Sequence, residues 1–556
     1  MQRLELTWIG KGQEPEVEPR ILLHDPSKDY GDPNSENMLI HGDNLLALKA
    51  LEQQYAGQVK CIYIDPPYNT GEAFECYDDN LEHSIWLGLM YSRLQILRNL
   101  LADDGFFCCQ IDDSEGHYLK VLLDEVFGRA GYYQTTIYVR VRYPEKTLKQ
   151  DMSFHKEIEQ VHVYRKSNLA KPILNKVEAG YEKFKYKIEI TGSPLKTLQL
   201  GGKKVEVYKK GDYKIVEEEG SEYGLKEIWA SGTILDGNSS GRFFRDYLTG
   251  RYAEDGYGVI YKVWGIGDDR YEYRFFTGPN REGATKGKYY QGVPMDKLES
   301  GKMTREVPIN GFLDLAAYFG NCRHEGGSEF RGGKKPEILI KTLFSHFTKE
   351  GDLVLDSFLG SGTTAAVAHK MGRKYIGIEL GEHCYSLCKP RLDRVIDGEQ
   401  TGISNDVNWH GGGGYKFYEL APTLIVKDEH GNDVFSDKYN AQMLVAAVAK
   451  VNGYFYAPDQ DVFWKQGYSQ DNSFIYVTTQ YLTAAMLDSL AKEVDAFESL
   501  LICAPAFDVG LNKRYDNITV KKIPQSVLDK CEYGVDNYNL NIVEVPECDE
   551  EEWEDD

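Results

Sequence analysis

The sequence has little that would place the protein in a membrane or in an oxidising compartment. It contains no apolar run long enough to span a bilayer, and its start, Met1 to Leu6, lacks the basic and then apolar pattern of a signal peptide. Its ten cysteines are scattered, and no second pair accompanies Cys384 and Cys388 at zinc-binding spacing. We therefore expect a cytoplasmic protein with reduced thiols and without a metal site.

Positive charge is also scarce. Lys and Arg number 64 against 87 Asp and Glu, and the formal net charge is −23 at pH 7, which at first argues against nucleic acid as a partner. Part of the negative excess lies in an acidic tail, residues 546–556. Lysines stand among aromatic residues between Lys183 and Lys214. On charge alone, this stretch fits a solvated β-ribbon as well as it fits a basic surface.

Apolar runs alternate with helical patterns in two parts of the chain. The expected strands cover residues 38–41, 59–64, 105–111, 353–358 and 374–380. The expected helices cover residues 44–55, 84–101, 116–127, 335–347, 361–371 and 382–396. Strands and helices that alternate at this spacing predict an α/β fold around a parallel sheet.

The region between these two parts has a different composition. It is rich in Gly, Tyr and Lys, with short alternating strands, and it predicts an inserted domain. Near residue 410, the run His410 to Gly414 resembles a linker, and a further βαβ unit follows it at Ser473–Thr478, Leu482–Val494 and Ser499–Ala504. The expected boundaries are an N-terminal segment 1–37, core halves 38–166 and 321–400, the insert 167–320, a C-terminal α/β domain 401–545 and the tail 546–556.

The tetrad Asp65-Pro66-Pro67-Tyr68 is the most informative motif. It follows the apolar run that begins at Val59 and predicts a buried parallel strand. Ligands of open α/β sheets bind outside the carboxyl ends of the strands, and the two prolines stiffen the turn. An acid and an aromatic ring therefore stand where a planar substrate can stack and form hydrogen bonds.

A second motif is a glycine turn between a strand and a helix. It runs from Leu353 through Asp356 and Gly360 to Thr364, and Glu379 ends the next expected strand about 20 residues later. A Walker-type phosphate loop needs a Lys before the Thr, and none is present. A nicotinamide site, a site for S-adenosylmethionine (SAM) and a purely structural turn stay open at this point.

Together the two motifs resemble those of the DNA amino-methyltransferases, which methylate an exocyclic base nitrogen. D-P-P-Y is similar to their catalytic motif, and D-x-F-x-G-S-G-T-T is similar to their SAM motif. The catalytic motif comes first and the insert lies between them, which resembles the β-class order with its target recognition domain. The extended match from Asp65 to Gly71 and the opening Leu6 to Lys11 look like modification (Mod) subunits of type III restriction–modification systems.

This resemblance implies a Rossmann-like, circularly permuted methyltransferase sheet and a role for each matched residue. Asp65 and the Pro66 carbonyl would accept hydrogen bonds from the target amino group, and Tyr68 would stack on a base flipped from the duplex. The residues implied to bind SAM are Asp43, Lys335, Pro336, Asp356, Phe358, Gly360, Gly362, Thr363 and Glu379. The candidates for the base pocket are Asn69, Phe74 and Tyr77.

The resemblance also implies partners. Lysines, arginines and aromatics in the insert suit contacts with double-stranded DNA, and the candidates there are Arg242, Arg245, Lys262 and Arg274. The implied function is SAM-dependent methylation of adenine N6 by a homodimer that serves a separate helicase–nuclease restriction subunit. The alternatives are a cytosine-N4 or solitary methyltransferase and, in another class, a non-catalytic DNA-recognition subunit.

Overall fold

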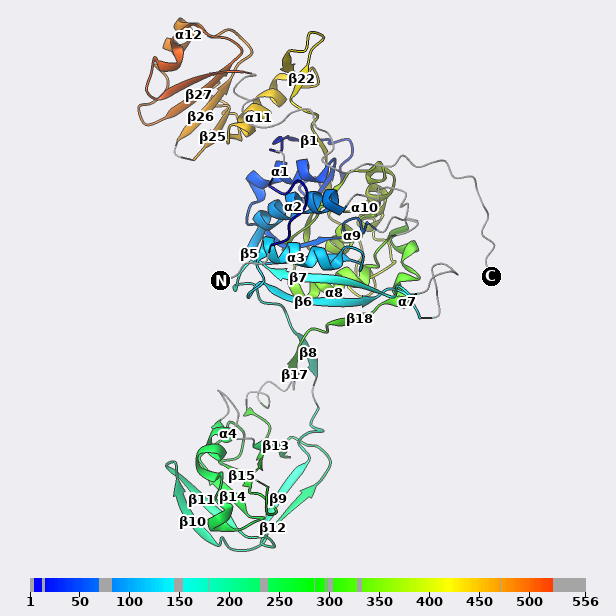
Figure 1. Ribbon diagram of the computed structural model, residues 1–556, viewed down its shortest axis with the longest axis vertical. Helices are drawn as coiled ribbons and strands as arrows, with labels where there is room; N and C mark the ends of the chain where they lie inside the picture. The colour runs from blue at the N-terminus through cyan, green and yellow to red at the C-terminus, as the bar shows by residue number, and fades with distance from the viewer. Residues whose placement is uncertain are drawn as a thin grey trace, which may run out of the picture. The chain divides into compact units, whose positions relative to one another are not determined.

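The computed structural model describes two compact units. The described residues are 5–12, 16–69, 83–144, 154–178, 180–230, 239–284, 286–295, 298, 304–327, 333–470 and 472–523. One unit comprises residues 1–173 with 310–556, and the other comprises residues 174–309 (Figure 1). The inserted region of the sequence thus folds as a body of its own, and its role in recognising a target stays a prediction.

A mixed sheet with a parallel centre forms the middle of the first unit. Its strand order is β1-β21-β3-β20-β19-β4-β5-β7-β6-β18, and β2 pairs with β21. The strands are β1 (Leu22–His24), β2 (Tyr30–Gly31), β3 (Met38–His41), β4 (Val59–Ile64), β5 (Leu101–Ile111), β6 (Tyr133–Arg140), β7 (Ile158–Arg165), β18 (Phe312–Asp314), β19 (Leu353–Asp356), β20 (Lys374–Glu379) and β21 (Gly414–Leu420). From β21 to β5 all neighbours are parallel, whereas β7 is antiparallel to both β5 and β6. This arrangement confirms the expected α/β class.

The helices of this unit form two packed groups. The first contains α1 (Asn44–Tyr55), α2 (His83–Leu100) and α3 (Gly116–Phe127), and the second contains α8 (Glu337–Phe347), α9 (Thr363–Lys370) and α10 (Lys389–Ile396) (Figure 1). The apolar stripes of the first group meet the sheet in a core where Leu46, Trp86 and Phe107 are fully buried. A short helix α7 (Ala316–Phe319) lies before the second group. No helix of the described residues is both long and apolar enough to cross a membrane.

The glycine run near residue 410 is not a linker between domains. Gly414 begins β21, which pairs in parallel with β3 and antiparallel with β1 and β2. A side chain at Gly414 would meet the backbone of Asp32 at 2.4 Å, so the glycine permits a close backbone approach. The expected boundary at residue 401 is therefore wrong. The core extends to Leu420, and the segment before residue 38 contributes two of its strands.

The second half of the core departs from the expected elements in two further places. The expected single helix 382–396 divides into a π-helical turn, η3 (Cys384–Cys388), and α10. Helix α8 starts at Glu337, because Pro336 has an extended backbone and precedes the first helical turn. Other boundaries in this half differ by one to two residues from the expectation.

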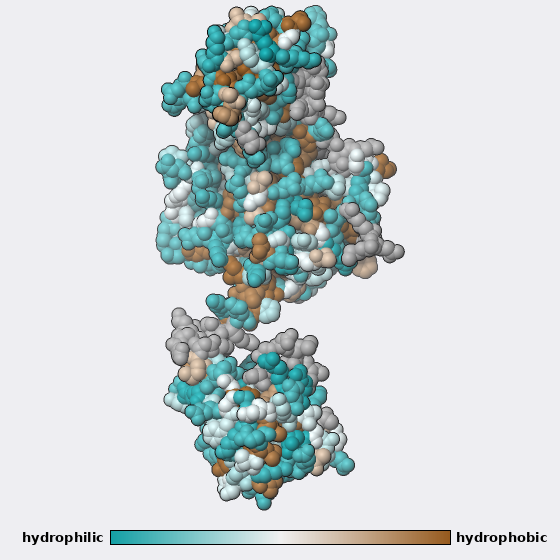
Figure 2. All heavy atoms as spheres, turned by 90° about the vertical axis from the view of Figure 1, so that its left-hand side faces the viewer, coloured by the Kyte–Doolittle hydropathy of each residue, from teal (hydrophilic) through white to brown (hydrophobic). Residues whose placement is uncertain are grey.

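A six-stranded antiparallel sheet forms the second unit. Its order is β10-β11-β14-β15-β16-β13. The strands and helices of the unit are β8 (Asn175–Glu178), β9 (Tyr186–Ile190), β10 (Lys196–Leu200), β11 (Lys203–Tyr208), β12 (Tyr213–Glu217), β13 (Lys226–Ala230), α4 (Ser239–Phe243), η1 (Phe244–Leu248), α5 (Tyr252–Asp255), β14 (Ile260–Trp264), β15 (Tyr273–Thr277), β16 (Gly287–Gln291) and β17 (Thr304–Val307). Phe243, Phe244 and Phe276 pack in its core. The face seen in Figure 2 is largely hydrophilic, as expected when the aromatic residues are gathered inside.

A smaller α/β layer follows the core sheet. Its sheet runs β24-β25-β26-β27-β28, and the last three strands are parallel. The elements are β22 (Ile425–Lys427), β23 (Asp433–Phe435), α11 (Ala441–Val451), β24 (Phe455–Tyr456), β25 (Gly467–Ser469), β26 (Ser473–Val477), α12 (Ala484–Leu490), β27 (Ser499–Ala504), η4 (Leu511–Lys513) and β28 (Ile518–Lys522). The βαβ unit is present, with a helix shorter than the expected 482–494. Thr483 caps it by accepting a hydrogen bond from the Met486 amide.

Candidate active site

Two strand ends bring the two sequence motifs together. Strands β4 and β19 are parallel neighbours, with Leu355 opposite Ile62. Each continues directly into an acid, Asp65 after β4 and Asp356 at the end of β19, and Glu379 ends the next strand, β20. Because parallel strands place their carboxyl ends at one edge of the sheet, residues nearly 300 positions apart in sequence share one site.

The D-P-P-Y tetrad, Asp65 to Tyr68, is held from several sides. Ile62 and Ile64 are fully buried in β4 and fix the strand that leads to it. The Trp86 indole donates a hydrogen bond to the Pro67 carbonyl at 2.8 Å, which anchors the proline turn to helix α2. The Tyr68 hydroxyl lies 2.8 Å from Asp65 Oδ1, so the ring and the acid of the motif form one unit.

Two charged residues outside the tetrad complete this cluster. The Lys335 ammonium lies 2.8 Å from Asp65 Oδ2, and Glu159 Oε2 lies 2.9 Å from the Tyr68 hydroxyl. Lys335 was expected on the SAM side, and its amine points to the acid of the tetrad, Asp65; its contact with SAM stays a prediction. Glu159 was missed, since an acid near the start of strand β7 has no distinguishing pattern in one sequence.

Burial controls the charge of this cluster. It raises the pKa of Asp65, the nearby Lys335 ammonium opposes that rise, and Glu159 adds to it. Burial alone would lower the pKa of Lys335, but the carboxylates of Asp65 and Glu159 outweigh it and the pKa is raised. Burial, followed by the two carboxylates, raises the pKa of Tyr68 well above its usual value. The phenol therefore stays protonated at neutral pH.

Backbone amides hold the acids of the glycine turn. Asp356 accepts hydrogen bonds from the Phe358 amide at 2.9 Å and the Thr364 hydroxyl at 2.6 Å. Burial raises the pKa of Asp356 to about 7. Gly362 caps helix α9 with φ of +79°, a conformation that glycine adopts without strain. The turn thus has a fixed shape before any ligand is considered.

Glu379 joins the end of β20 to the same turn. Its Oε2 accepts a hydrogen bond from the Gly360 amide at 2.7 Å, and its Oε1 accepts from the amides of Leu380 and Gly381. The side chain is almost fully buried. Glu379 therefore lies where the sequence placed it, at a strand end beside the glycine turn.

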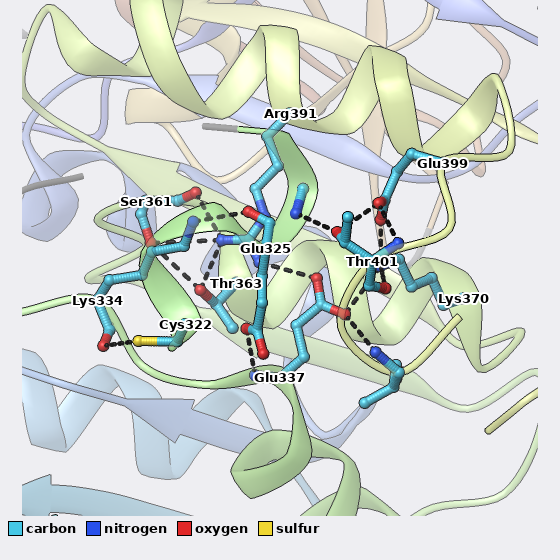
Figure 3. A network of polar contacts seen from close by, with 12 residues as sticks. Cys322, Glu325, Lys334, Glu337, Ser361, Thr363, Lys370, Arg391, Glu399 and Thr401 are labelled. Carbon is cyan, nitrogen blue, oxygen red and sulfur yellow. Dashed lines mark hydrogen bonds and ion pairs between the residues drawn. The ribbon is translucent and has the colours of Figure 1, made fainter. Parts of the chain in front are cut away.

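A buried polar network contacts the turn (Figure 3). Arg391 is fully buried, and its guanidinium donates to the Ser361 carbonyl at 3.2 Å and to Thr363 Oγ1 at 2.7 Å. It also pairs with Glu337 at 2.9 Å, and Glu337 pairs with Lys370 at 2.8 Å. Because Glu337 opens helix α8, the network connects the glycine turn with the segment that carries Lys335 and Pro336.

Two groups at the edge of this network have strongly shifted pKa values. Burial and the nearby Glu337 raise the pKa of Glu325 to about 7. Burial and the nearby Arg391 lower the pKa of Lys334 to about 8. Glu325 accepts a hydrogen bond from the Glu337 amide at 2.9 Å, at the start of helix α8. None of these groups was singled out from the sequence, and no pattern in one chain marks them.

Asp43, which the resemblance places near the SAM adenine, also has structural contacts. Its carboxylate caps helix α1 at the Leu46 amide, 3.0 Å away, and pairs with the buried Arg93 at 3.3 Å. The neighbouring Asn44 donates to the Ser357 carbonyl at 2.7 Å. In this motif, Asn44 rather than Asp43 reaches the glycine turn.

The other residues of the site have separate surroundings. Asn69 has φ of +57°, and its amide donates to Glu115 at 2.8 Å. Phe358 is buried in the main core. Phe74 and Tyr77 lie outside the described residues. Among the residues that the structure describes, no cluster of three potential metal ligands occurs.

The four expected DNA contacts in the second unit divide into two kinds. Arg242 and Arg245 are exposed, although Arg245 pairs with Asp246 at 2.7 Å. Lys262 lies over the rings of Trp264 and Tyr273, at 4.3 and 3.8 Å from their centroids. Arg274 is buried and pairs with Asp269 at 2.7 Å. Arg274 is therefore a structural residue, because its charge is used inside the unit.

Comparison with known proteins agrees with this geometry. The sequence profile of the DNA methylase family matches residues 59–390. The probable type III restriction-modification enzyme HindVI Mod subunit of Haemophilus influenzae is 36% identical over 420 residues, which cover 70% of this chain and 54% of that protein. The type III EcoPI Mod subunit of Escherichia phage P1 is 27% identical over 452 residues, covering 72% and 65%.

The type III EcoP15I Mod subunit of Escherichia coli is 24% identical over 505 residues, covering 76% of this chain and 72% of that protein. The matched regions therefore span only about half to two thirds of the first two relatives. The profile match covers more than half of this chain and includes both strand-end acids and Glu379. On this evidence, the chain belongs to the DNA methylase family.

Proposed function

We propose that the chain transfers a methyl group from SAM to N6 of an adenine that is flipped out of double-stranded DNA. The observation that carries this proposal is the pairing of Asp65 and Tyr68 with the Asp356 turn at the ends of adjacent strands β4 and β19. A methyl acceptor held at the first motif would lie beside a methyl donor held at the second. The order of the motifs and the names of the relatives support the same function.

The glycine turn has the chemistry that SAM requires. SAM presents a carboxylate, an ammonium group and ribose hydroxyls, which need backbone amides and acids. The turn offers Asp356 and Glu379, and a Cβ atom placed on Gly360 would find only the Phe358 carbonyl, at 4.0 Å. The buried Ser357 hydroxyl has no hydrogen-bond partner among the described residues. The open space at Gly360 and the unsatisfied hydroxyl of Ser357, both in the turn, each fit a bound ligand.

The catalytic residues would act mainly by positioning. When bound, SAM supplies a methyl group on a positively charged sulfur. The target amino group is a poor nucleophile, because its lone pair is delocalised into the base. A hydrogen bond to Asp65 favours the pyramidal nitrogen that frees the lone pair, and Tyr68 supports the base by stacking. Lys335 must leave Asp65 Oδ2, or share it, when the amino group arrives.

The second unit would bind the DNA and read its sequence. Lys262 stands on two aromatic rings at the surface of the sheet, and Arg242 and Arg245 are exposed on the short helical segment. Such residues suit contacts with phosphates and base edges. We assign recognition of the target to this unit by its position between the two motifs.

The relatives support a modification subunit of a type III-like restriction–modification or phage-defence system. Such a subunit would act in the cytoplasm as a homodimer together with a separate helicase–nuclease subunit. Light scattering of the purified protein, alone and with the product of an adjacent helicase–nuclease gene, tests this assembly. A strictly monomeric protein that binds no such product would favour a solitary methyltransferase.

Methyl transfer from tritiated SAM to duplex DNA tests the activity itself. Sequencing that detects modified bases in the DNA of an expressing host would then report the target base and its sequence context. N6-methyladenine at one motif is the expected result, because D-P-P-Y resembles the adenine enzymes more than the cytosine enzymes. N4-methylcytosine would favour the alternative base. No label in any DNA would favour the non-catalytic recognition subunit.

A further inference from the structure

A second carboxylate shares the hydroxyl of the catalytic tyrosine. Tyr68 Oη lies 2.8 Å from Asp65 Oδ1 and 2.9 Å from Glu159 Oε2. Glu159 belongs to strand β7, which is two strands away from β4 in the sheet, and to neither sequence motif. The tyrosine thus connects the acid of the motif with an acid that the motif does not include.

The phenol can serve the two carboxylates only in turn. A phenol has a single hydrogen and can donate it to only one of the two carboxylates at a time. When Asp65 gains a proton and donates it to the phenol oxygen, the phenol hydrogen can turn to Glu159. The arrangement therefore offers a proton route from Asp65 through Tyr68 to Glu159.

We propose that Glu159 receives, through Tyr68, the proton that the target amino group loses after methyl transfer. This inference rests on the proposed methyltransferase function and adds to it a residue outside the family motifs. Glu159 touches Tyr68 rather than the substrate, so it is a positioning residue that acts through the tyrosine.

The step balances in atoms and charge. The amino nitrogen forms a bond to the methyl carbon, the bond from that carbon to sulfur breaks, and the nitrogen becomes positively charged. Asp65 takes one proton from the nitrogen. A proton then moves from Asp65 to the Tyr68 oxygen while the phenol proton moves to Glu159, which returns Asp65 to its ionised, accepting state.

The surroundings of Glu159 suit a proton acceptor. The Gln110 amide donates to Glu159 Oε2 at 2.5 Å, and the Tyr63 hydroxyl in turn donates to the Gln110 carbonyl, also at 2.5 Å. These buried side chains fix the position of the carboxylate. The Lys335 ammonium lies 3.8 Å from Glu159 Oε2 and 2.8 Å from Asp65 Oδ2. One ammonium thus faces both acids and moderates the charge change as the proton passes.

Other charged groups lie near the pair but do not touch Glu159. Asp356 stands at the end of the neighbouring strand β19, and its negative charge, like that of Asp65, acts on Tyr63 and Cys109. Burial raises the pKa of Asp65, which suits a carboxyl that is protonated in one stage of the cycle. The groups facing Glu159 are accordingly Tyr68, Gln110 and Lys335.

The first test is the pH dependence of a single turnover. Glu159→Gln keeps the size and one acceptor but cannot take a proton. At pH 7 its methyl-transfer rate should fall by roughly 10²-fold, as is typical when a general base is removed. The deficit should shrink as pH rises, because hydroxide can take the proton, and SAM and DNA affinities should be retained. A rate equal to wild type, or a deficit that is the same at every pH, would overturn the proposal.

Two variants complete the kinetic test. Tyr68→Phe keeps the aromatic ring but breaks the route, so it should show the same pH-dependent deficit, and the double variant should be no slower than either single variant. Additive losses would contradict a shared route. Glu157→Gln is the matched control, because this neighbouring acid pairs with Arg140 at 3.3 Å and should leave the rate unchanged.

Activity of the wild type separates this inference from the function on which it rests. A wild type that methylates no DNA would mean that the methyltransferase function fails. An active wild type whose rate equals that of Glu159→Gln would leave that function in place and overturn the proton route.

Discussion

The two acids at the ends of β4 and β19 are neighbours, yet they are held by different kinds of group. Asp65 contacts the side chains of Lys335 and Tyr68, which can exchange protons and partners. Asp356 is held by the Phe358 amide and the Thr364 hydroxyl in a fixed turn. In the proposed reaction, the site would combine an adaptable acid, Asp65, where the acceptor enters and a proton leaves, with a rigid acid, Asp356, where the donor is positioned.

The largest expected effect comes from a substitution of Asp65 that leaves the Asp356 turn in place. Asp65→Ala should lower the methyl-transfer rate by roughly 10³-fold, because it removes the group that orients and polarises the amino nitrogen. SAM affinity, measured by calorimetry, should be unchanged, since the Asp356 turn forms none of its described hydrogen bonds to Asp65. A matching loss of SAM affinity would show that the two acids do not act separately.

More of the Asp356 turn than of the Asp65 cluster could be predicted from the sequence. The fold class, the strands before Asp65 and Asp356, and the place of Glu379 follow from patterns within about 20 residues, because the turn is built from local backbone. The contacts of Lys335 and Glu159 with the tetrad depend on how distant strands and loops meet, which side-chain periodicity does not encode. The glycine run before β21 was misread because glycine marks both flexible linkers and close backbone approaches.

The next effect concerns Arg391, whose side chain holds the glycine turn of Asp356 in place. Arg391→Met removes a buried guanidinium that binds Ser361, Thr363 and Glu337. The free energy of unfolding should fall by about 3 kcal/mol, the lower end for a broken buried ion pair, because Glu337 keeps Lys370. Urea titration gives this value, and SAM affinity should fall with it.

Arg394→Met is the matched control for this prediction. It lies on the same helix, but its guanidinium donates only to the carbonyls of Gly326 and Gly327 among its described hydrogen bonds, at the edge of the site. Its loss should change SAM affinity much less. Equal effects of the two variants would mean that the turn does not depend on the buried network.

A smaller effect is the pH dependence of stability that Glu325, at the edge of the buried network, should cause. Glu325 has a pKa of about 7 in the folded protein, against an ordinary value of 4.5 for a free glutamate side chain. The folded state holds its proton between these values, so its contribution to stability is full below about pH 4.5 and is lost as pH rises through 7. Discounted for partial solvent exposure, the change is about 2 kcal/mol.

Glu325→Gln should remove this dependence and keep the hydrogen bond from the Glu337 amide. The free energy of unfolding of the variant minus that of wild type should therefore be about 2 kcal/mol higher at pH 8 than at pH 5. Thermal or urea unfolding at both pH values measures the difference. The exposed Glu429→Gln serves as control, and a pH-independent difference for Glu325→Gln would contradict the assignment.

The smallest effect comes from a substitution that removes the charge of Glu379 but keeps the shape of its side chain. Glu379→Gln keeps an oxygen that can accept the Gly360 amide but loses the negative charge that strengthens its three backbone hydrogen bonds. Charged hydrogen bonds exceed neutral ones by about 1 kcal/mol, so SAM affinity should fall roughly fivefold while the maximal rate stays near that of wild type. The same exchange at Asp65, Asp65→Asn, should lower the maximal rate, because an amide accepts no proton. If both variants change the same parameter, the division into a positioning acid and a proton-exchanging acid is wrong.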